Sequence, residues 1–245
     1  MSRNQDLPLK SFLSACTTAE CQDCDARPHS VCAGVPEHGI ADLEANVTHM
    51  SVEPRGAILM EGDPAHHMFN VTSGTVRVYK LLPDGRRQVI GFLMTGDFLG
   101  FAVRDAYAYS AEAVTEVSLC RFSRPRMEAL LQKFPGMEKR LLGLAANELA
   151  IAQDLMLLLG RKTARERLAS FFLMMVERLT RLGRTGNPLP LPMSRSDIAD
   201  YLGLTTETVS RAFTQFRNDG LIALEGTDTV RLTDLAGLQE IADGN

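Results

Sequence analysis

The sequence has no long hydrophobic run. No continuous apolar stretch among its 245 residues approaches the roughly 18 residues that cross a bilayer, so we predict no contact with a membrane. Leu13-Ser14-Ala15-Cys16 resembles a lipoprotein cleavage site, but residues 4–10 before it lack the continuous apolar core of a signal peptide. We therefore expect a cytoplasmic protein.

Catalytic signatures are missing as well. The chain contains no Walker loop, no dinucleotide-binding fingerprint, no paired catalytic carboxylates and no Ser/His/Asp arrangement. These absences argue against an enzyme, and we predict that the protein is not one.

An overall excess of positive charge, common in nucleic-acid-binding proteins, is also absent. The net charge is −4, but residues 161–220 hold ten Lys or Arg and six Asp or Glu, so this segment carries +4 and the remainder −8. A DNA-binding module joined to an acidic domain has this distribution.

The chain falls into four segments by composition and periodicity. Residues 1–40 are rich in cysteine and show no periodicity, and residues 41–135 alternate short β-like runs with turns. Residues 136–160 have helical periodicity, and residues 161–245 combine helices with a final hairpin. We predict an α+β protein in which an antiparallel β-roll, a long dimerisation helix and a winged helix-turn-helix domain follow the cysteine-rich segment.

Two apolar seams run along residues 136–160 at alternating four- and three-residue spacing. A helix that is apolar on two sides must be buried on two sides. The seam that includes Glu148 can cover the β-roll, whereas the other contains no charge and suits the same helix of a second subunit. Burial of both seams inside a monomer is the alternative. The predicted dimer seam consists of Leu142, Ala145, Leu149, Ala152, Met156 and Leu159.

Residues 194–219 have the pattern of a helix-turn-helix. Ser194 and Asp197 resemble a capping box at the start of a helix that ends at Gly203, and a second helix follows to about Asn218. Residues 221–232 then predict a β-hairpin wing. Two short helices joined by a tight glycine-containing turn form a DNA-binding motif.

The second of these helices carries a polar face suited to base edges. Glu207, Ser210 and Arg211 lie at i, i+3 and i+4 and share one side of the helix. Arginine can donate twice to guanine, glutamate can accept from cytosine, and serine can do either. We predict that these three residues read the DNA sequence. Predicted phosphate contacts come from residues at or beside the helix starts, namely Ser194, Arg195, Thr205 and Thr208.

Cysteines form the second candidate site. Cys21, Cys24 and Cys32 lie close together, and Cys120, which we place at the end of a strand, can supply a fourth thiolate. Four thiolates suit either a [4Fe–4S] cluster or a zinc ion, and the residues alone do not choose between them. A metalloenzyme or redox carrier is the reading from another functional class. Cys16 has no place in this set of four ligands, and we interpret it as a free thiol.

The run Tyr201-Leu-Gly-Leu-Thr-Thr-Glu-Thr-Val-Ser-Arg211 resembles the CRP/FNR superfamily of bacterial regulators. Glu207-Thr-Val-Ser210-Arg211 is similar to the recognition helix of its FNR branch, and the cysteine pattern resembles α-proteobacterial members of that branch. The resemblance implies a homodimer that binds double-stranded DNA at palindromes with TTGAT half-sites. It also implies a [4Fe–4S] cluster on Cys21, Cys24, Cys32 and Cys120 that senses oxygen. A relative without a cluster, or with zinc, is the alternative.

The same resemblance bears on two further partners. Cyclic-nucleotide sites of the superfamily use an Arg-Ser-Ala run, whereas this chain has Tyr109-Ser110-Ala111, so no cation meets the phosphate and we expect no cyclic nucleotide. The hairpin tip Asp84-Gly85-Arg86 matches a position through which FNR-like activators contact RNA polymerase holoenzyme. An ordinary solvated turn is the alternative there.

Overall fold

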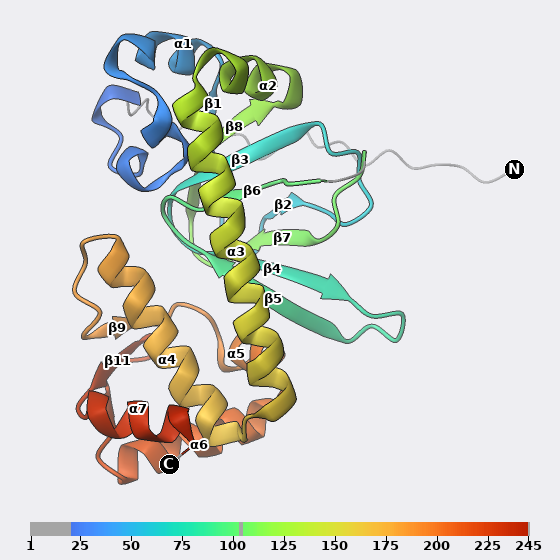
Figure 1. The fold of residues 1–245 in the computed structure, drawn as a ribbon. Helices are drawn as coiled ribbons and strands as arrows, with labels where there is room; N and C mark the ends of the chain where they lie inside the picture. Colours follow the sequence, from blue (N-terminus) through green and yellow to red (C-terminus); the bar gives the residue numbers. More distant parts are fainter. Residues whose placement is uncertain (1–20, 103–104, 245) are drawn as a thin grey trace, which may run out of the picture. The chain divides into compact units, whose positions relative to one another are not determined.

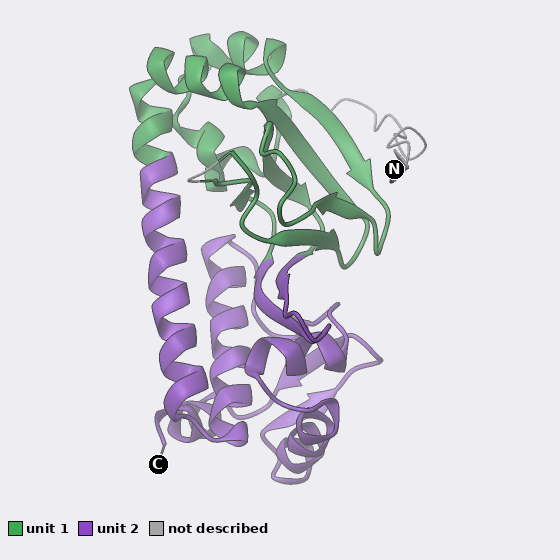
Figure 2. Ribbon diagram, turned by 90° about the vertical axis from the view of Figure 1, so that its right-hand side faces the viewer, with its two compact units in different colours: residues 1–76, 93–140 green, residues 77–92, 141–245 purple. Residues whose placement is uncertain are grey.

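Residues 21–102 and 105–244 are described by the computed structural model, drawn in Figure 1. Their contacts divide the chain into two compact units, coloured in Figure 2: one comprises Met1–Val76 with Leu93–Arg140, the other Arg77–Phe92 with Leu141–Asn245. The sequence division kept residues 41–135 together, but by its contacts the hairpin within this range groups with the C-terminal unit. Cys16 and the cleavage-like residues 13–16 lie outside the described residues.

The first unit is built on an antiparallel sheet in the order β1-β8-β3-β6. Side chains on both faces of its central strand β8 are buried, with Leu119 on one face and Cys120 and Phe122 on the other. Strands β2 and β7 pair separately in the same unit. The predicted β-rich domain is therefore present. The strands are β1 (Thr48–Val52), β2 (Ala57–Leu59), β3 (His67–Ser73), β6 (Phe98–Leu99), β7 (Ser110–Ala113) and β8 (Val117–Ser123).

Short helices precede and follow these strands. The cysteine-bearing segment, which has no periodicity in sequence, folds into four 3-10 turns and one α-helix that the sequence did not predict. Helix α2 follows β8 directly, and the chain then turns at Phe134 into the long helix α3. The elements are η1 (Cys21–Asp23), η2 (Arg27–His29), η3 (Val31–Gly34), η4 (Glu37–Gly39), α1 (Ile40–Ala45), α2 (Arg124–Lys133) and α3 (Pro135–Arg161).

Helix α3 matches the predicted dimerisation helix to within a residue at each end. Its predicted dimer seam is the open one, because Leu142, Leu149 and Met156 are 71%, 61% and 70% exposed. The other seam is more covered, and Leu158 at its end is buried. The absence of a continuous apolar run led us to expect no segment able to cross a membrane. Helix α3 nevertheless is long and apolar enough to do so by length and composition. One such helix is weak evidence for a membrane, and its exposed apolar stripe has another explanation in the predicted dimer.

The second unit contains a helical core with a small sheet. Phe172 of α4 packs against Phe213 and Phe216 of α6 with ring centroids 5.2 and 6.2 Å apart, and all three are buried. The sheet has the order β10-β11-β9, and its hairpin is the predicted wing. Helix α7 was not predicted. The elements are β4 (Val76–Leu81), β5 (Arg87–Leu93), α4 (Ala164–Arg181), β9 (Leu189–Pro190), α5 (Arg195–Leu202), α6 (Thr206–Asn218), β10 (Ile222–Leu224), β11 (Thr229–Leu232) and α7 (Leu235–Asp243).

A buried carboxylate ties the β4–β5 hairpin to α5 within this unit. Oδ1 of Asp197 accepts from Arg77 and from Arg87 at 2.7 Å each, and Arg87 also bonds Asp200 at 2.7 Å. The Asp197 side chain is only 5% exposed. Burial raises the pKa of Asp197, but the Ser194 hydroxyl and the two arginines outweigh burial and hold the pKa below its ordinary value. The hairpin is therefore anchored to the first helix of the helix-turn-helix.

Replacing Asp197 with Asn removes the charge that both arginines share. We expect the free energy of unfolding at pH 7 to fall by about 3 kcal/mol, as when one member of a buried ion pair is lost. Because the folded pKa is lowered, this contribution is complete above the ordinary carboxyl pKa of about 3.9 and disappears as the pH falls through the lowered value.

Denaturant unfolding at pH 7 and in acid measures both effects. The matched control is Asp84→Asn, whose carboxylate pairs with Arg86 on the surface and is 52% exposed, so stability should hardly change. An Asp197→Asn variant as stable as the control at pH 7 would contradict the assigned anchor.

Candidate nucleic-acid interface and cysteine site

The predicted helix-turn-helix is present with its local signals in place. Ser194 Oγ accepts from the Asp197 N–H at 3.1 Å while the Asp197 carboxylate accepts from the Ser194 N–H, which completes a capping box. Helix α5 ends at Gly203 with φ 62°, a left-handed conformation that glycine adopts freely. Thr205 caps α6 by accepting from the Thr208 N–H at 3.1 Å.

The three predicted base-reading residues share the exposed side of α6. Glu207, Ser210 and Arg211 are exposed, whereas Val209 and Phe213 on the opposite side are buried. Arg211 donates to Glu207 at 2.5 Å across one helical turn, and both side chains are more than 70% exposed. Such an exposed pair contributes little to stability. Arg211 and Glu207 can therefore break their mutual bond and bind DNA bases at a small cost in free energy. Ser210 Oγ donates to the Thr206 carbonyl at 2.9 Å and retains its lone pairs for a donor.

The predicted phosphate contacts lie near the starts of the two helices. Thr205 and Thr208 hydroxyls are 2.8 Å apart on the surface, and the Ser194 hydroxyl is occupied by the capping box. Arg195 also makes a contact that the sequence did not predict, because its guanidinium carbon lies 3.3 Å from the centroid of the Phe213 ring. Burial lowers the pKa of Arg195. The sequence gives no signal for this stacking, which depends on how α5 crosses α6.

The four predicted cysteine ligands line one pocket of the first unit. Cys21, Cys24, Cys32 and Cys120 contribute to it, together with side chains that include Asn70. Cys21, Cys32 and Cys120 are buried, Cys24 is half-buried, and all four are free thiols. The sequence prediction placed Cys120 at the end of a strand, and this was wrong, because Cys120 lies in the middle of β8. The structure thus brings together residues separated by up to 99 positions (120 − 21).

These thiols are poorly solvated and influence one another. Burial raises the pKa of Cys21 to about 11 and that of Cys32 to about 12, and it raises the pKa of Cys120 further. The neighbouring cysteines add to each of these increases. Metal ligands are thiolates, so the site requires a positively charged group to stabilise its deprotonated form.

The arrangement of donors distinguishes two kinds of inorganic group. A zinc ion holds all its sulfur ligands about 2.3 Å from one point. Within residues 21–102 and 105–244, no three His, Cys, Asp or Glu side chains are grouped closely enough to hold a single metal ion. In an iron–sulfur cluster several irons share the cysteines, which stand around a larger object. The four thiols line one pocket, and the described side chains are not grouped around a single point.

The cysteine segment contacts the start of α3 inside the same unit. Arg140 of α3 donates to the carbonyl of His29 at 2.9 Å and to that of Ser30 at 3.2 Å. Gly34 and Gly136 touch through their backbones, since a Cβ on Gly34 would clash with the Gly136 carbonyl oxygen. The segment between Cys24 and Cys32 is thus joined to the start of α3 by two hydrogen bonds. Gly34, just after that segment, adds a close backbone contact.

The predicted polymerase contact and the stretch at Tyr109 and Ser110, where we expect no cyclic nucleotide, each have a defined local structure. Asp84, Gly85 and Arg86 form the tight turn between β4 and β5, where the Asp84 carboxylate bonds the Arg86 side chain at 2.8 Å. In the β-roll, Ser110 Oγ accepts from the Glu61 N–H at 3.0 Å, and the Tyr109 hydroxyl accepts from the Gly100 N–H at 3.1 Å. These hydroxyls are thus engaged within the protein.

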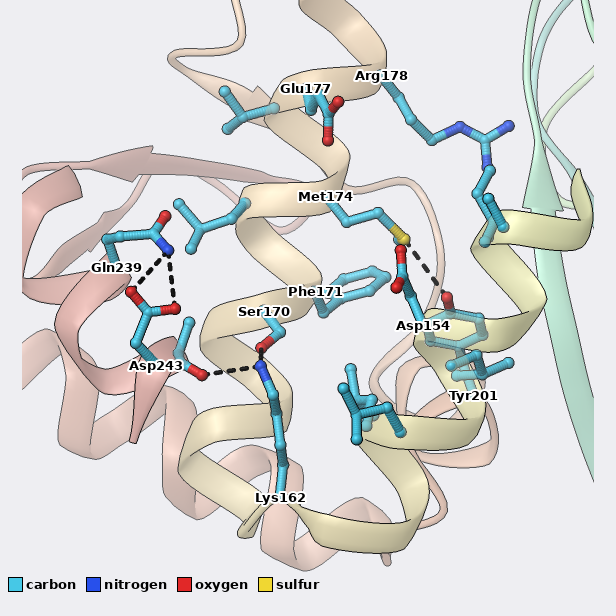
Figure 3. Close-up of a pocket in the computed structure, with 18 of the residues that line it drawn as sticks. Asp154, Lys162, Ser170, Phe171, Met174, Glu177, Arg178, Tyr201, Gln239 and Asp243 are labelled. Carbon is cyan, nitrogen blue, oxygen red and sulfur yellow. Dashed lines mark hydrogen bonds between the residues drawn. The ribbon is translucent and has the colours of Figure 1, made fainter. Parts of the chain in front are cut away.

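Figure 3 shows a cavity of about 530 Å³ in the second unit, lined by α3, α4, α7 and Tyr201. Lys162 Nζ donates to Ser170 Oγ at 2.8 Å, and the Tyr201 hydroxyl donates to Met174 Sδ at 3.4 Å. Its apolar lining includes Leu155 and Leu158 from the inner seam of α3. The cavity marks the side on which α3 faces α4, opposite the open seam.

Comparison with known proteins places both halves of the chain. Residues 166–241 match the Crp-like helix-turn-helix domain, and residues 49–134 match the cyclic nucleotide-binding domain. The chain is 41% identical to the nitrogen fixation regulation protein FixK of Bradyrhizobium diazoefficiens over 83% of its own length and 86% of the relative's. It is 39% identical to the transcriptional activator protein FnrL of Cereibacter sphaeroides, covering 91% of each chain.

Solved structures show the same architecture. The structure of FixK2 from Bradyrhizobium japonicum superposes with a TM-score of 0.74 at 39% identity, covering 80% of this chain and 96% of that one. The expected fold class is confirmed by this match together with the two domain matches.

Proposed function

The chain belongs to the CRP/FNR family of transcription regulators, in its FNR branch, and on that premise we propose that it is an oxygen-responsive activator controlled by a [4Fe–4S] cluster. Membership confirms two sequence predictions, that the protein is a DNA-binding regulator and that it is not an enzyme. A DNA-binding regulator of this kind acts in the cytoplasm, which is the location we propose.

The observation that carries the proposal is the gathering of four thiols in one pocket. Cys21, Cys24, Cys32 and Cys120 come from two distant parts of the chain, yet they line the same cavity. When bound, a [4Fe–4S] cluster supplies metal–thiolate bonds that oxygen can break. The residues of this chain then decide how the loss of those bonds is transmitted.

Transmission runs through the contact between the cysteine segment and α3. With Cys24 and Cys32 held in place, the carbonyls of His29 and Ser30 are positioned to accept from Arg140. Without that restraint the four short turns are held mainly by local hydrogen bonds, so the Arg140 bonds and the Gly34–Gly136 contact loosen. The seam of α3 that we propose as the dimer interface begins at Leu142, two residues after Arg140.

Dimerisation supplies the link to DNA. The open seam of Leu142, Ala145, Leu149, Ala152, Met156 and Leu159 has the heptad spacing of a two-stranded coiled coil. A dimer joins two copies of α6, so that a palindrome with TTGAT half-sites is held at both ends and binding strengthens through effective concentration. A monomer holds one half-site only. We propose that the Asp84–Arg86 turn contacts RNA polymerase.

Two other ligands are disfavoured within this proposal. Zinc requires sulfurs that converge on a point, which the described cysteines do not provide. A cyclic nucleotide requires a cation for its phosphate, and Tyr109 stands where related sites carry arginine. A cluster-free regulator of the same family remains the alternative, and the next experiment distinguishes it from a cluster-binding one. Membership of the family excludes the interpretation as a redox enzyme.

An anaerobic absorbance spectrum tests the cluster directly. We expect brown protein with a broad band that bleaches in air, because thiolate-bound iron and sulfide absorb in the visible range. Serine at position 21, 24, 32 or 120 should abolish the colour, whereas Cys16→Ser, the matched control, should retain it. A colourless wild-type protein that contains zinc, or no metal, would contradict the proposal.

The DNA face is tested by two arginine variants. Arg211→Ala should weaken binding to the palindrome by about 1–3 kcal/mol and relax the preference at one base pair, because it removes a base contact. Arg195→Ala should weaken binding to all sequences alike and reduce the salt dependence, as loss of a phosphate contact does. Because Arg195 also packs on Phe213, the stability of the Arg195→Ala variant to unfolding is measured as well, which separates a loss of folding from a loss of DNA binding. Equal losses of sequence preference in both variants would overturn the assigned roles.

A further inference from the structure

One side chain in the cysteine pocket has no role in the account so far. Asn70 of β3 lines the pocket and is 2% exposed. Its Oδ1 is buried and has no hydrogen-bond partner among the residues that the structure describes. Leaving a buried amide without partners is unfavourable, because the hydrogen bonds that it makes with water in the unfolded chain are not replaced. An amide in this position therefore points to a partner that the polypeptide itself does not provide.

The sheet fixes what Asn70 faces. Because β8 pairs with both β1 and β3, residues opposite one another form a row on one face: His49, Cys120, Asn70 and, on β6, Phe98. Directly opposed residues have Cβ atoms about 5 Å apart. Cys120 thus has a polar neighbour on each side, with His49 Nδ1 at 3.5 Å from its Sγ and the Asn70 amide on the other strand.

The other lining groups do not satisfy the amide. Ser30 Oγ donates to the Arg27 carbonyl at 3.1 Å and accepts from the Cys32 N–H at 3.2 Å, so it is already engaged. Leu43, Val47 and Phe122 are apolar. Arg27 also lines the pocket, but its guanidinium makes no hydrogen bond to Asn70 Oδ1. The remaining candidates are sulfur atoms. An ionised thiolate or a cluster sulfide only accepts hydrogen bonds, and the NH₂ end of the same amide donates once the side chain turns about its terminal bond.

We propose that Asn70 is a positioning residue of the cluster site, which donates an N–H to sulfur, either the Cys120 thiolate or a sulfide of the cluster. The inference rests on the proposed function, because it presupposes a cluster in this pocket. A hydrogen bond to sulfur stabilises the more negatively charged, reduced state, and such bonds are among the factors that set the reduction potential of a cluster. Asn70 thereby also holds sulfur ligands that burial otherwise disfavours as thiolates.

The test compares the wild type with Asn70→Leu, which keeps the shape of the side chain and removes both polar ends. Each protein is prepared metal-free and after anaerobic reconstitution with iron and sulfide. Three quantities are measured: the unfolding temperature of both forms, the reduction potential of the reconstituted form, and the rate at which an iron chelator removes its iron under argon.

We expect opposite effects in the two forms. Metal-free Asn70→Leu should unfold about 2–4 °C above the metal-free wild type, because a buried unpaired amide has been removed. Reconstituted Asn70→Leu should unfold below the reconstituted wild type and should have a more negative reduction potential. It should also lose iron about 2- to 10-fold faster, the range that one net hydrogen bond represents. Asn70→Ser retains a smaller donor, so its potential and iron-loss rate should lie between those of the wild type and Asn70→Leu. It also provides a test if the leucine variant does not fold.

Ser110→Ala is the matched control, because Ser110 is also a buried polar residue of the first unit but lies outside the cysteine pocket and is already hydrogen-bonded. It should lower the unfolding temperature of both forms alike and leave the potential unchanged. Equal potentials and equal iron-loss rates for wild type and Asn70→Leu would overturn the inference, as would a stability change of the same sign in both forms. A wild-type protein that takes up no cluster would instead overturn the proposed function.

Discussion

The pairing of β8 with strands on both of its sides is the constraint on which the cysteine site depends. Cys120 is at the centre of this strand, so its position is fixed by two ladders of backbone hydrogen bonds. Of the other three cysteines, Cys21 and Cys32 lie in short 3-10 turns and Cys24 lies between two such turns, where few such bonds hold the chain. One rigid ligand and three adaptable ones make a site whose geometry depends on what is bound. In the proposed mechanism, loss of the bound group releases the turns and leaves the sheet unchanged.

We propose that helix α3 turns this local difference into a change of assembly. Its first residues touch the cysteine segment, its inner seam faces α4, and its outer seam is open. The exposed leucines and methionine make the isolated helix apolar enough to resemble a membrane span, although a coiled coil with a second copy accounts for the same stripe. The seam contains no charge that opposes pairing, so the proposed switch requires the state of the cysteine segment to decide whether the dimer forms.

Much of this could be predicted from sequence because the signals are local. The capping residues of α5 and α6, the glycine at position 203 and the periodicity of α3 all act within a few residues of one another. The features that were missed depend on packing between distant segments. Examples are the stacking of Arg195 on Phe213, the anchoring of the β4–β5 hairpin by Asp197, and the mid-strand position of Cys120. The isolated amide of Asn70 also becomes visible only once strand register is known.

The central claim is that the cysteine site controls the pairing of α3, and sedimentation under anaerobic conditions tests it most directly. The reconstituted protein should sediment as a dimer, and the same sample should sediment as a monomer after air has removed its colour. Reconstituted Arg140→Ala keeps all four cysteines but lacks the bonds to His29 and Ser30, and it should shift toward monomer while still coloured. A dimer of unchanged strength in all three samples would contradict the account.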